Sequence, residues 1–213
     1  MTYAIGRGCR VEIGITEAAP KTVTAVTAAK PPVATSTAHG LTGKSLAYFA
    51  TATGMPQLEG QAVRLNPVTT NDVTLEDLDA TGYGTFTAGS LVPISAYSTL
   101  VSSTEYNKAG GDANPLDVTV LLDDISQNVN GPLAAETVTF SGRVETISST
   151  AMQKIREVAR SGLYLVFRVT LKDGNVRFFR GQPGIPTEQV TQGAVGSYSF
   201  AITVKGFVCE GAA

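Results

Sequence analysis

The segment from Gly196 to Val208 alternates between two kinds of side chain along its length. One parity carries apolar residues and the other carries small or polar ones: Tyr198, Phe200, Ile202 and Val204 against Ser199, Ala201, Thr203 and Lys205. Because successive side chains of an extended chain point to opposite faces, this pattern predicts a β-strand with one buried and one wet face. Such a strand needs neighbours, since a lone strand cannot bury its apolar side.

Three other segments show similar alternation, namely residues 9–15, 118–122 and 138–144. In the last of them Gly142 interrupts the pattern and marks a weak point or a β-bulge. The segments come from both ends and the middle of the chain. We therefore expect one main sheet that joins the two termini.

Residues 150–161 carry the pattern of an amphipathic helix. Thr150 and Gln153 are spaced as a capping box, and Gly162 stands where a helix-ending glycine belongs. The expected buried stripe is Ala151, Met152, Ile155, Val158 and Ala159. The opposite face carries Lys154, Arg156, Glu157 and Arg160. Its basic residues Lys154, Arg156 and Arg160 form either a solvated helix surface or a contact with another subunit.

A hairpin follows the helix. Residues 163–171 and 175–180 are strand-like, and Asp173-Gly174 between them is a strong turn signal. Together with the alternating segments and the helix, this predicts a mainly-β fold: a β-sandwich or half-barrel flanked by one α-helix.

Residues 21–94 show a different sequence pattern. Short strand-like pieces at near-regular spacing are separated by turns rich in glycine and proline, such as Pro31-Pro32 and Gly54-Met55-Pro56. This pattern suggests a small β-barrel or sandwich. We therefore divide the chain into a core of residues 1–20 and 95–213 and an inserted small β domain of residues 21–94. Tyr48, Phe49, Tyr83 and Phe86 are expected in the core of the insert.

Two long stretches lack periodicity, residues 123–135 and 182–196. Long loops of this kind in compact domains are usually functional or disordered. The first begins with Asp123-Asp124, which we interpret as a solvated strand end rather than a metal or acid pair, because adjacent side chains of a strand diverge. Ile125, Val129 and Leu133 recur every four residues in it and could anchor it to a partner as a helical turn.

Composition narrows the functional classes. The net charge is −2 with 16% charged residues, which gives no basic stripe for wrapping nucleic acid. There is no long apolar run for crossing a membrane, and the first residues lack the apolar region of a secretory signal.

His39 is the single histidine and is expected to be a turn residue bonded to backbone. Cys9 and Cys209 are out of phase for a simple disulfide, so we expect reduced thiols. No nucleophile motif, cofactor site or metal site is indicated, and we expect a protein that is not an enzyme.

The carboxy-terminal half resembles the major tail tube proteins of long, flexible-tailed bacteriophages. The resemblance rests on Asp117-Val118-Thr119, a long polar loop, Thr-Val-Thr-Phe-Ser-Gly at 137–142, the helix, the hairpin and the closing strand. It covers residues 1–20 and 95–213 in the order of their elements. A local resemblance links residues 38–60 and 81–89 to a small β module common in phage proteins, and it concerns the fold alone.

The tail tube resemblance implies homo-hexameric rings stacked into a hollow tube in the virion tail, assembled in the host cytoplasm. Tape measure, terminator and distal tail proteins would be its partners, and DNA would pass through the lumen without specific binding. The long loop would bridge neighbouring rings through Asp123, Asp124, Ile125, Gln127, Asn128, Val129, Asn130 and Leu133. The alternative function is a phage surface-binding module, in which the insert recognises a receptor or glycan through its aromatic residues.

Overall fold

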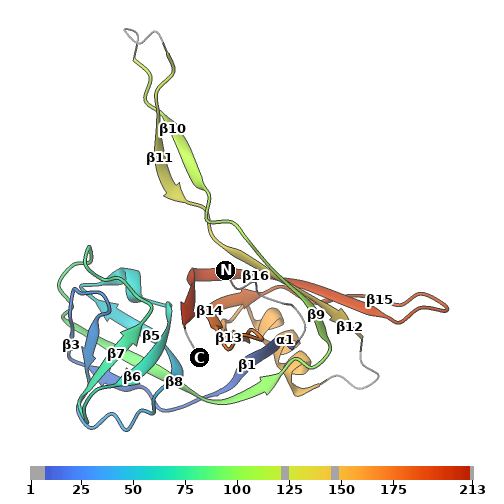
Figure 1. The fold of residues 1–213 in the computed structure, drawn as a ribbon, viewed down its shortest axis with the longest axis horizontal. Coiled ribbons are helices and arrows are strands. Elements are labelled where there is room, and N and C mark those ends of the chain that lie inside the picture. The colour runs from blue at the N-terminus through green and yellow to red at the C-terminus, as the bar shows by residue number, and fades with distance from the viewer. Residues whose placement is uncertain (1–7, 121–124, 145–148, 212–213) are drawn as a thin grey trace.

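The computed structural model describes residues 8–120, 125–144 and 149–211. Within them the chain is mainly β, with one α-helix and one short 3-10 turn, η1 (Pro56–Leu58) (Figure 1). The helix α1 spans Thr150–Ser161. The strands are β1 Arg10–Glu17, β2 Lys21–Val23, β3 Ala25–Val26, β4 Val33–Thr35, β5 Ser45–Thr53, β6 Ala62–Pro67, β7 Asp72–Glu76, β8 Ala88–Thr99, β9 Ser103–Ala109, β10 Ala113–Asp117, β11 Asn128–Leu133, β12 Thr137–Arg143, β13 Leu165–Thr170, β14 Val176–Pro183, β15 Thr187–Gln189 and β16 Ser197–Gly211. The predicted mainly-β class with one flanking helix is confirmed.

Fourteen strands of the described chain form one continuous, curled sheet in the order β3-β4-β7-β6-β5-β8-β1-β13-β14-β16-β12-β9, with β15 added to β16 and β2 to β8. The strand β16 is where this sheet folds back, because its first part pairs with β12 and its second part pairs with β14. The strands β1 and β16 belong to the same sheet, so the expected joining of the two ends of the chain is confirmed.

The alternation of β16 sets up the main core. Tyr198, Phe200, Ile202 and Val204 are all buried, as the sequence pattern predicts. In the pairing of β12 with β16, Phe140 lies opposite Phe200. The ring of Phe140 then lies 6.2 Å from that of Phe167 on β13, so the two halves of the folded sheet meet across stacked aromatic rings.

The helix α1 closes this core. Its buried residues are Ala151, Met152, Ile155 and Val158, while Ala159 is half-buried. Gly162 ends the helix in the left-handed conformation, at φ 68°, and its N–H donates to the carbonyl of Val158, as predicted. The predicted capping box is wrong by one residue. Ser149 caps the helix because its backbone is still extended and its hydroxyl accepts from the N–H of Met152.

Residues 21–94 hold a second core, built from strands β2 to β7 and the first part of β8. The strand β8 continues from this part of the molecule into the main sheet, where it pairs with β1 (Figure 1). Phe49 and Phe86 are buried here, Tyr48 is buried at the joint described next, and Tyr83 is half-buried. The boundaries of an inserted domain at residues 21 and 94 stay a prediction.

A third cluster of buried side chains joins the two parts. Val166 on β13 and Phe178 on β14 point away from the main core and pack against Leu46 and Tyr48 of β5. Cys209 belongs to this cluster and is almost fully buried, and burial raises the pKa of its thiol to about 12. Cys9 and Cys209 are both thiols rather than a disulfide, as expected.

A buried glutamine locks this joint. Gly206, at φ 84°, lies in an irregular stretch of β16 where the pairing with β14 changes register. There the side chain of Gln61, 1% exposed, accepts from the N–H of Phe207 and donates to its carbonyl, both at 3.1 Å. The amide therefore replaces the ladder partners that Phe207 loses in the bulge.

His39 is buried between two backbone groups, with the N–H of Leu41 donating to Nδ1 at 2.9 Å and Nε2 lying 3.2 Å from the carbonyl oxygen of Thr69. The expected role as a turn residue is confirmed.

The bulge predicted at Gly142 is also confirmed, because the pairing of β12 with β9 shifts between Ser141 and Gly142.

The docking of α1 gives a first prediction. Ile155 is fully buried in the main core, so Ile155→Asp removes apolar burial and buries an unpaired carboxylate. We expect a loss of about 3–5 kcal/mol in the free energy of unfolding, measured by urea denaturation. Gln153→Asp, at an exposed position of the same helix, should change it by about 0.5 kcal/mol or less. A folded Ile155→Asp protein of normal stability would show that the helix does not dock through this face.

The joint gives a second prediction. Gln61→Leu keeps the size of the side chain but leaves the N–H and carbonyl of Phe207 without their partner. We expect the free energy of unfolding to fall by about 1–3 kcal/mol. Gln57→Leu, an exposed glutamine nearby in the chain, is the matched control and should be near neutral. Equal stability of the two variants would remove Gln61 from the locking of the joint.

Candidate assembly interface

A two-stranded hairpin projects from the body of the molecule. The strands β10 and β11 pair only with each other among the described strands and stand apart from the main sheet (Figure 1). At its outer part the N–H of Val118 donates to the carbonyl of Gln127, and Asp117 accepts from both the N–H and the hydroxyl of Thr119. Because it lacks a third strand or a helix to pack on, the hairpin has little stability of its own.

The hairpin corrects two predictions. Residues 118–120 are not a strand of the main sheet: the strand ends at Asp117, and 118–120 continue as an exposed connection, while 121 and 122 lie outside the described residues. Residues 123–135 are not a loop throughout, because 128–133 form β11. The reason is that alternation identifies an extended segment but not its partner, and here the partner is the neighbouring polar segment. Gly131 allows β11 to approach β10 closely, since a Cβ at this position would lie only 2.7 Å from the carbonyl oxygen of Asn114.

The residues predicted to bridge rings are distributed over this hairpin. Asp123 and Asp124 lie outside the described residues. Ile125 and Gln127 lie near its end, and β11 contains the remaining four: Asn128, Val129, Asn130 and Leu133. Ile125 is 77% exposed and Leu133 71%, and Leu116 and Val129, opposite each other in the pairing, are exposed too. The hairpin thus carries apolar side chains that nothing in the described chain covers.

The base of the hairpin is tied to the body. The carboxylate of Glu136, directly before β12, forms an ion pair with Lys108 at 2.8 Å and accepts a hydrogen bond from the N–H of Val208 at 2.6 Å. The carbonyl of Glu136 also accepts from the N–H of Val204. The hairpin therefore projects from a fixed point on β16 and not from a free loop.

The basic face of α1 is partly engaged within the chain. Lys154 forms an ion pair with Glu157 at 3.1 Å, and Arg156 forms one with Glu188 on β15. Arg160 is exposed. Arg156 thus fastens the helix to β15, part of the stretch 182–196 that the sequence assigned to a loop, and a subunit contact through this face stays a prediction.

One layer of the folded sheet has two open edges. Its strands run in the order β15-β16-β12-β9, and within the described residues neither β15 nor β9 has a strand on its outer side. Unpaired edges of this kind are templates for pairing with another chain. The outward face of the layer carries small, mostly uncharged side chains: Asn107, Ala109, Thr137, Thr139, Ser141, Ser199, Ala201 and Thr203.

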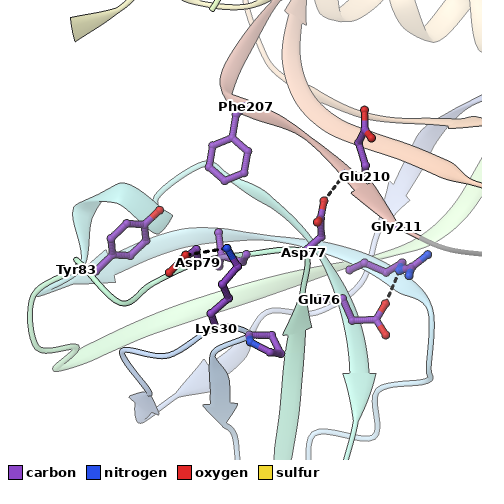
Figure 2. Close-up of a pocket in the computed structure, with 11 residues that line it drawn as sticks. Lys30, Glu76, Asp77, Asp79, Tyr83, Phe207, Glu210 and Gly211 are labelled. Carbon is purple, nitrogen blue, oxygen red and sulfur yellow. Dashed lines mark hydrogen bonds and ion pairs between the residues drawn. The ribbon is translucent and has the colours of Figure 1, made fainter. Parts of the chain in front are cut away.

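A hollow lies where the end of β16 meets residues 30–31 and 76–83, with a volume of about 730 Å³. Figure 2 shows Tyr83 beside Asp79 and Lys30, with Phe207 above them and Asp77, Glu76 and Glu210 farther across the hollow. Hydrogen bonds from Thr81 and the ion pair with Lys30 lower the pKa of Asp79 to about 2. Sequence reasoning missed this hollow, and the one available signal was Gly206 inside a strand pattern.

The aromatic residues proposed for surface recognition are mostly not available. Phe49 and Phe86 form an edge-to-face pair in the core of residues 21–94, with ring centroids 6.3 Å apart, and Tyr48 is buried. Tyr83 alone of the four reaches the hollow. Among the described residues no His, Cys, Asp and Glu side chains gather as a metal ion requires, and no helix is long and apolar enough to cross a membrane.

In the comparisons with known proteins, the chain matches one protein family. The model of the family described as "Phage tail tube protein, TTP" matches residues 53–211, from the end of β5 to the end of β16. A comparison with curated protein sequences finds no match.

Two solved structures are similar in fold over part of the chain. A chain of the virion of a native gene transfer agent (GTA) particle is 15% identical, with a TM-score of 0.45, covering 55% of this chain and 89% of that one. A chain of the tail of an empty GTA particle, solved with C6 symmetry, is 17% identical, with a TM-score of 0.45, covering 63% of this chain and 92% of that one. Because the family model spans well over half of the sequence, the chain belongs to the phage tail tube protein family.

Proposed function

We propose that this tail tube protein assembles into homo-hexameric rings that stack into the tube, with the layer β15-β16-β12-β9 facing the lumen. The single observation that carries the proposal is the combination found in that layer: two open edges and a mostly uncharged polar face. Edge-to-edge pairing of such layers from successive subunits closes a ring, as strand edges do in closed barrels.

The chemistry of the face suits a channel for DNA. Side chains in its central part are hydroxyls, an amide and methyl groups, and the charged residues Glu105 and Arg143 lie toward its margins. Lysine or arginine in this position would bind phosphates and hold the DNA, because backbone phosphates dominate affinity for basic surfaces. A wall that forms weak, exchangeable hydrogen bonds lets a polyanion slide.

The position of residues 21–94 supports the same orientation. They pack on Val166 and Phe178, which point outward from the layer of β13 and β14. The polar face belongs to the other layer, on the far side of the aromatic core. When the polar face lines the lumen, residues 21–94 therefore lie on the exterior of the tube, where they do not obstruct it.

The hairpin β10–β11 supplies the contact between rings. Its exposed apolar side chains cannot be covered by the chain that carries them, so burial against a subunit of the next ring would stabilise both. Asp123 and Asp124 belong to the connection between the two strands and contribute to this contact in the proposal. Arg160 on α1 is the remaining candidate for a lateral contact.

The proposed role is structural and not enzymatic, and it requires no cofactor. Assembly takes place in the host cytoplasm, and the tape measure, terminator and distal tail proteins are the other partners in the tail. The alternative function, a surface-binding module, has less support because Tyr48, Phe49 and Phe86 are buried.

Shortening the hairpin tests the contact between rings. Asp117 and Asn128 are paired, so replacing residues 118–127 by Asn-Gly closes the hairpin with a two-residue turn. We expect an unchanged thermal midpoint, because the main core is untouched, and loss of tubes in negative-stain micrographs. Val190→Ser, an exposed position in the connection between β15 and β16, is the control and should still give tubes. Tubes of normal length from the shortened protein would exclude the hairpin from stacking.

Lysine substitutions test the lumen. Thr139→Lys and Thr203→Lys, on the polar face, should leave folding intact but make assembled tubes retain short duplex DNA, with retention falling as salt rises. The measurement is DNA that survives nuclease treatment of the tubes. Thr53→Lys, exposed on residues 21–94, should bind DNA that the nuclease still degrades. Equal protection by all three variants would contradict the orientation of the layer.

A further inference from the structure

The hollow beside the end of β16 has features that tube building does not use. It lies between the main sheet and residues 21–94, and ligand sites occur preferentially at such junctions. Its apolar lining is Pro31, Leu78, Tyr83 and Phe207. Its volume of about 730 Å³ lies within the range of about 300–1,000 Å³ that holds small organic groups or a few side chains.

Phe207 is presented to the hollow by a built feature of the fold. The bulge at Gly206 changes the direction of the chain. The side chain of Gln61 hydrogen-bonds the backbone of Phe207, and the carboxylate of Glu136 accepts from the N–H of Val208. The ring remains 38% exposed although its backbone is fixed. A rigid aromatic ring facing a hollow can bind a partner with little loss of side-chain entropy.

The charges of the hollow are unbalanced. Four carboxylates line it, from Glu76, Asp77, Asp79 and Glu210, against Lys30 and Arg64. Lys30 pairs with Asp79 at 3.0 Å and Arg64 with Glu76 at 2.5 Å, while Glu210 pairs with Arg177 at 3.1 Å on the surface outside. Asp77 accepts the N–H of Glu210, and no lysine or arginine of the described chain lies within ion-pair distance of it. The hollow therefore has a net negative charge beside two aromatic rings (Figure 2).

Aromatic faces and carboxylates together select one ligand chemistry. Ring faces attract cations through their quadrupoles, and a carboxylate hydrogen-bonds an ammonium or guanidinium group. The aliphatic stems of lysine and arginine pack on apolar surface while their charged ends stay polar. We propose that the hollow is a docking site for a lysine or arginine side chain, with an adjacent apolar side chain, on a segment of another protein. In this arrangement the stem lies on Phe207 and Tyr83 and the charge lies at Asp77.

This site goes beyond the proposed tube and does not depend on ring assembly. It can therefore be tested on the full-length monomer in dilute solution. The probes are three peptides that differ in one side chain: acetyl-Leu-Lys-Leu-amide, acetyl-Leu-Gln-Leu-amide and acetyl-Leu-Glu-Leu-amide. The readout is the NMR signals of the Tyr83 and Phe207 rings during titration, with maltotriose as a neutral sugar for comparison.

We expect the lysine peptide to shift both rings and the other probes to leave them unchanged. Asp77→Asn should weaken binding of the lysine peptide about tenfold, since the hydrogen bond to the ammonium group loses its anionic acceptor. Asparagine tolerates the left-handed backbone of residue 77, at φ 58°, and can still accept the N–H of Glu210, so the charge alone is removed. Phe207→Leu should weaken binding while keeping the position apolar. Glu59→Gln, an exposed carboxylate of residues 21–94 that does not line the hollow, is the matched control and should bind as the native protein does.

Several results would overturn the proposal. Equal shifts with the lysine, glutamine and glutamate peptides would show a general apolar site. Shifts with maltotriose and none with the lysine peptide would make the hollow a glycan site. Binding of the lysine peptide that Asp77→Asn leaves unchanged would place the cation elsewhere, and no shift with any probe would show that the hollow does not bind side chains of this type.

Discussion

The double role of β16 is the constraint on which the rest of the structure depends. One strand must supply the apolar side of the main core and, on its other side, the polar face that we place in the lumen. Period-two alternation is what allows both: Phe200 and Ile202 are buried, while Ala201 and Thr203, which alternate with them, are exposed. A slip of one residue in the pairing with β12 would exchange the two faces, so the packed rings of Phe140, Phe167 and Phe200 also fix the proposed lumen surface.

The same strand connects the parts of the molecule that reach outward. Past Val204 it leaves β12, while its pairing with β14, which begins at Ile202, continues and changes register at the bulge around Gly206. Glu136, at the base of the projecting hairpin, accepts a hydrogen bond from the N–H of Val208, and Gln61, from residues 21–94, donates one to the carbonyl of Phe207. The hairpin and residues 21–94 are thus held against one short stretch of backbone. Buried, fully bonded polar groups of this kind specify one arrangement, because any other would leave them without partners.

Much of the fold could be predicted from the sequence because its signals are local. Alternation in β1, β12 and β16 identified the strands of the sheet, Gly162 the end of α1, and Gly142 a bulge. The hairpin β10–β11 was misread, because Val118 and Val120 alternate as a sheet strand does while Asn128, Asn130 and Gly131 in its true partner region show no pattern. Pairing depends on which segments meet, and one strand alone does not carry that information. Ser149 was missed as the helix cap since Ser and Thr are adjacent there and only the backbone angles separate their roles. The acidic hollow brings together segments that are more than 100 residues apart, so its one local signal, Gly206 inside a strand pattern, could not show which residues line it.

The orientation of the subunit in the tube is the central claim, and an electron cryo-microscopy reconstruction of tubes grown from the purified protein tests it most directly. The account predicts six subunits per ring, with the layer β15-β16-β12-β9 forming the wall of the lumen. Thr139 and Thr203 should then face the axis, and residues 21–94 should lie on the exterior. A reconstruction in which residues 21–94 line the channel, or in which Thr139 and Thr203 face outward, would contradict the account.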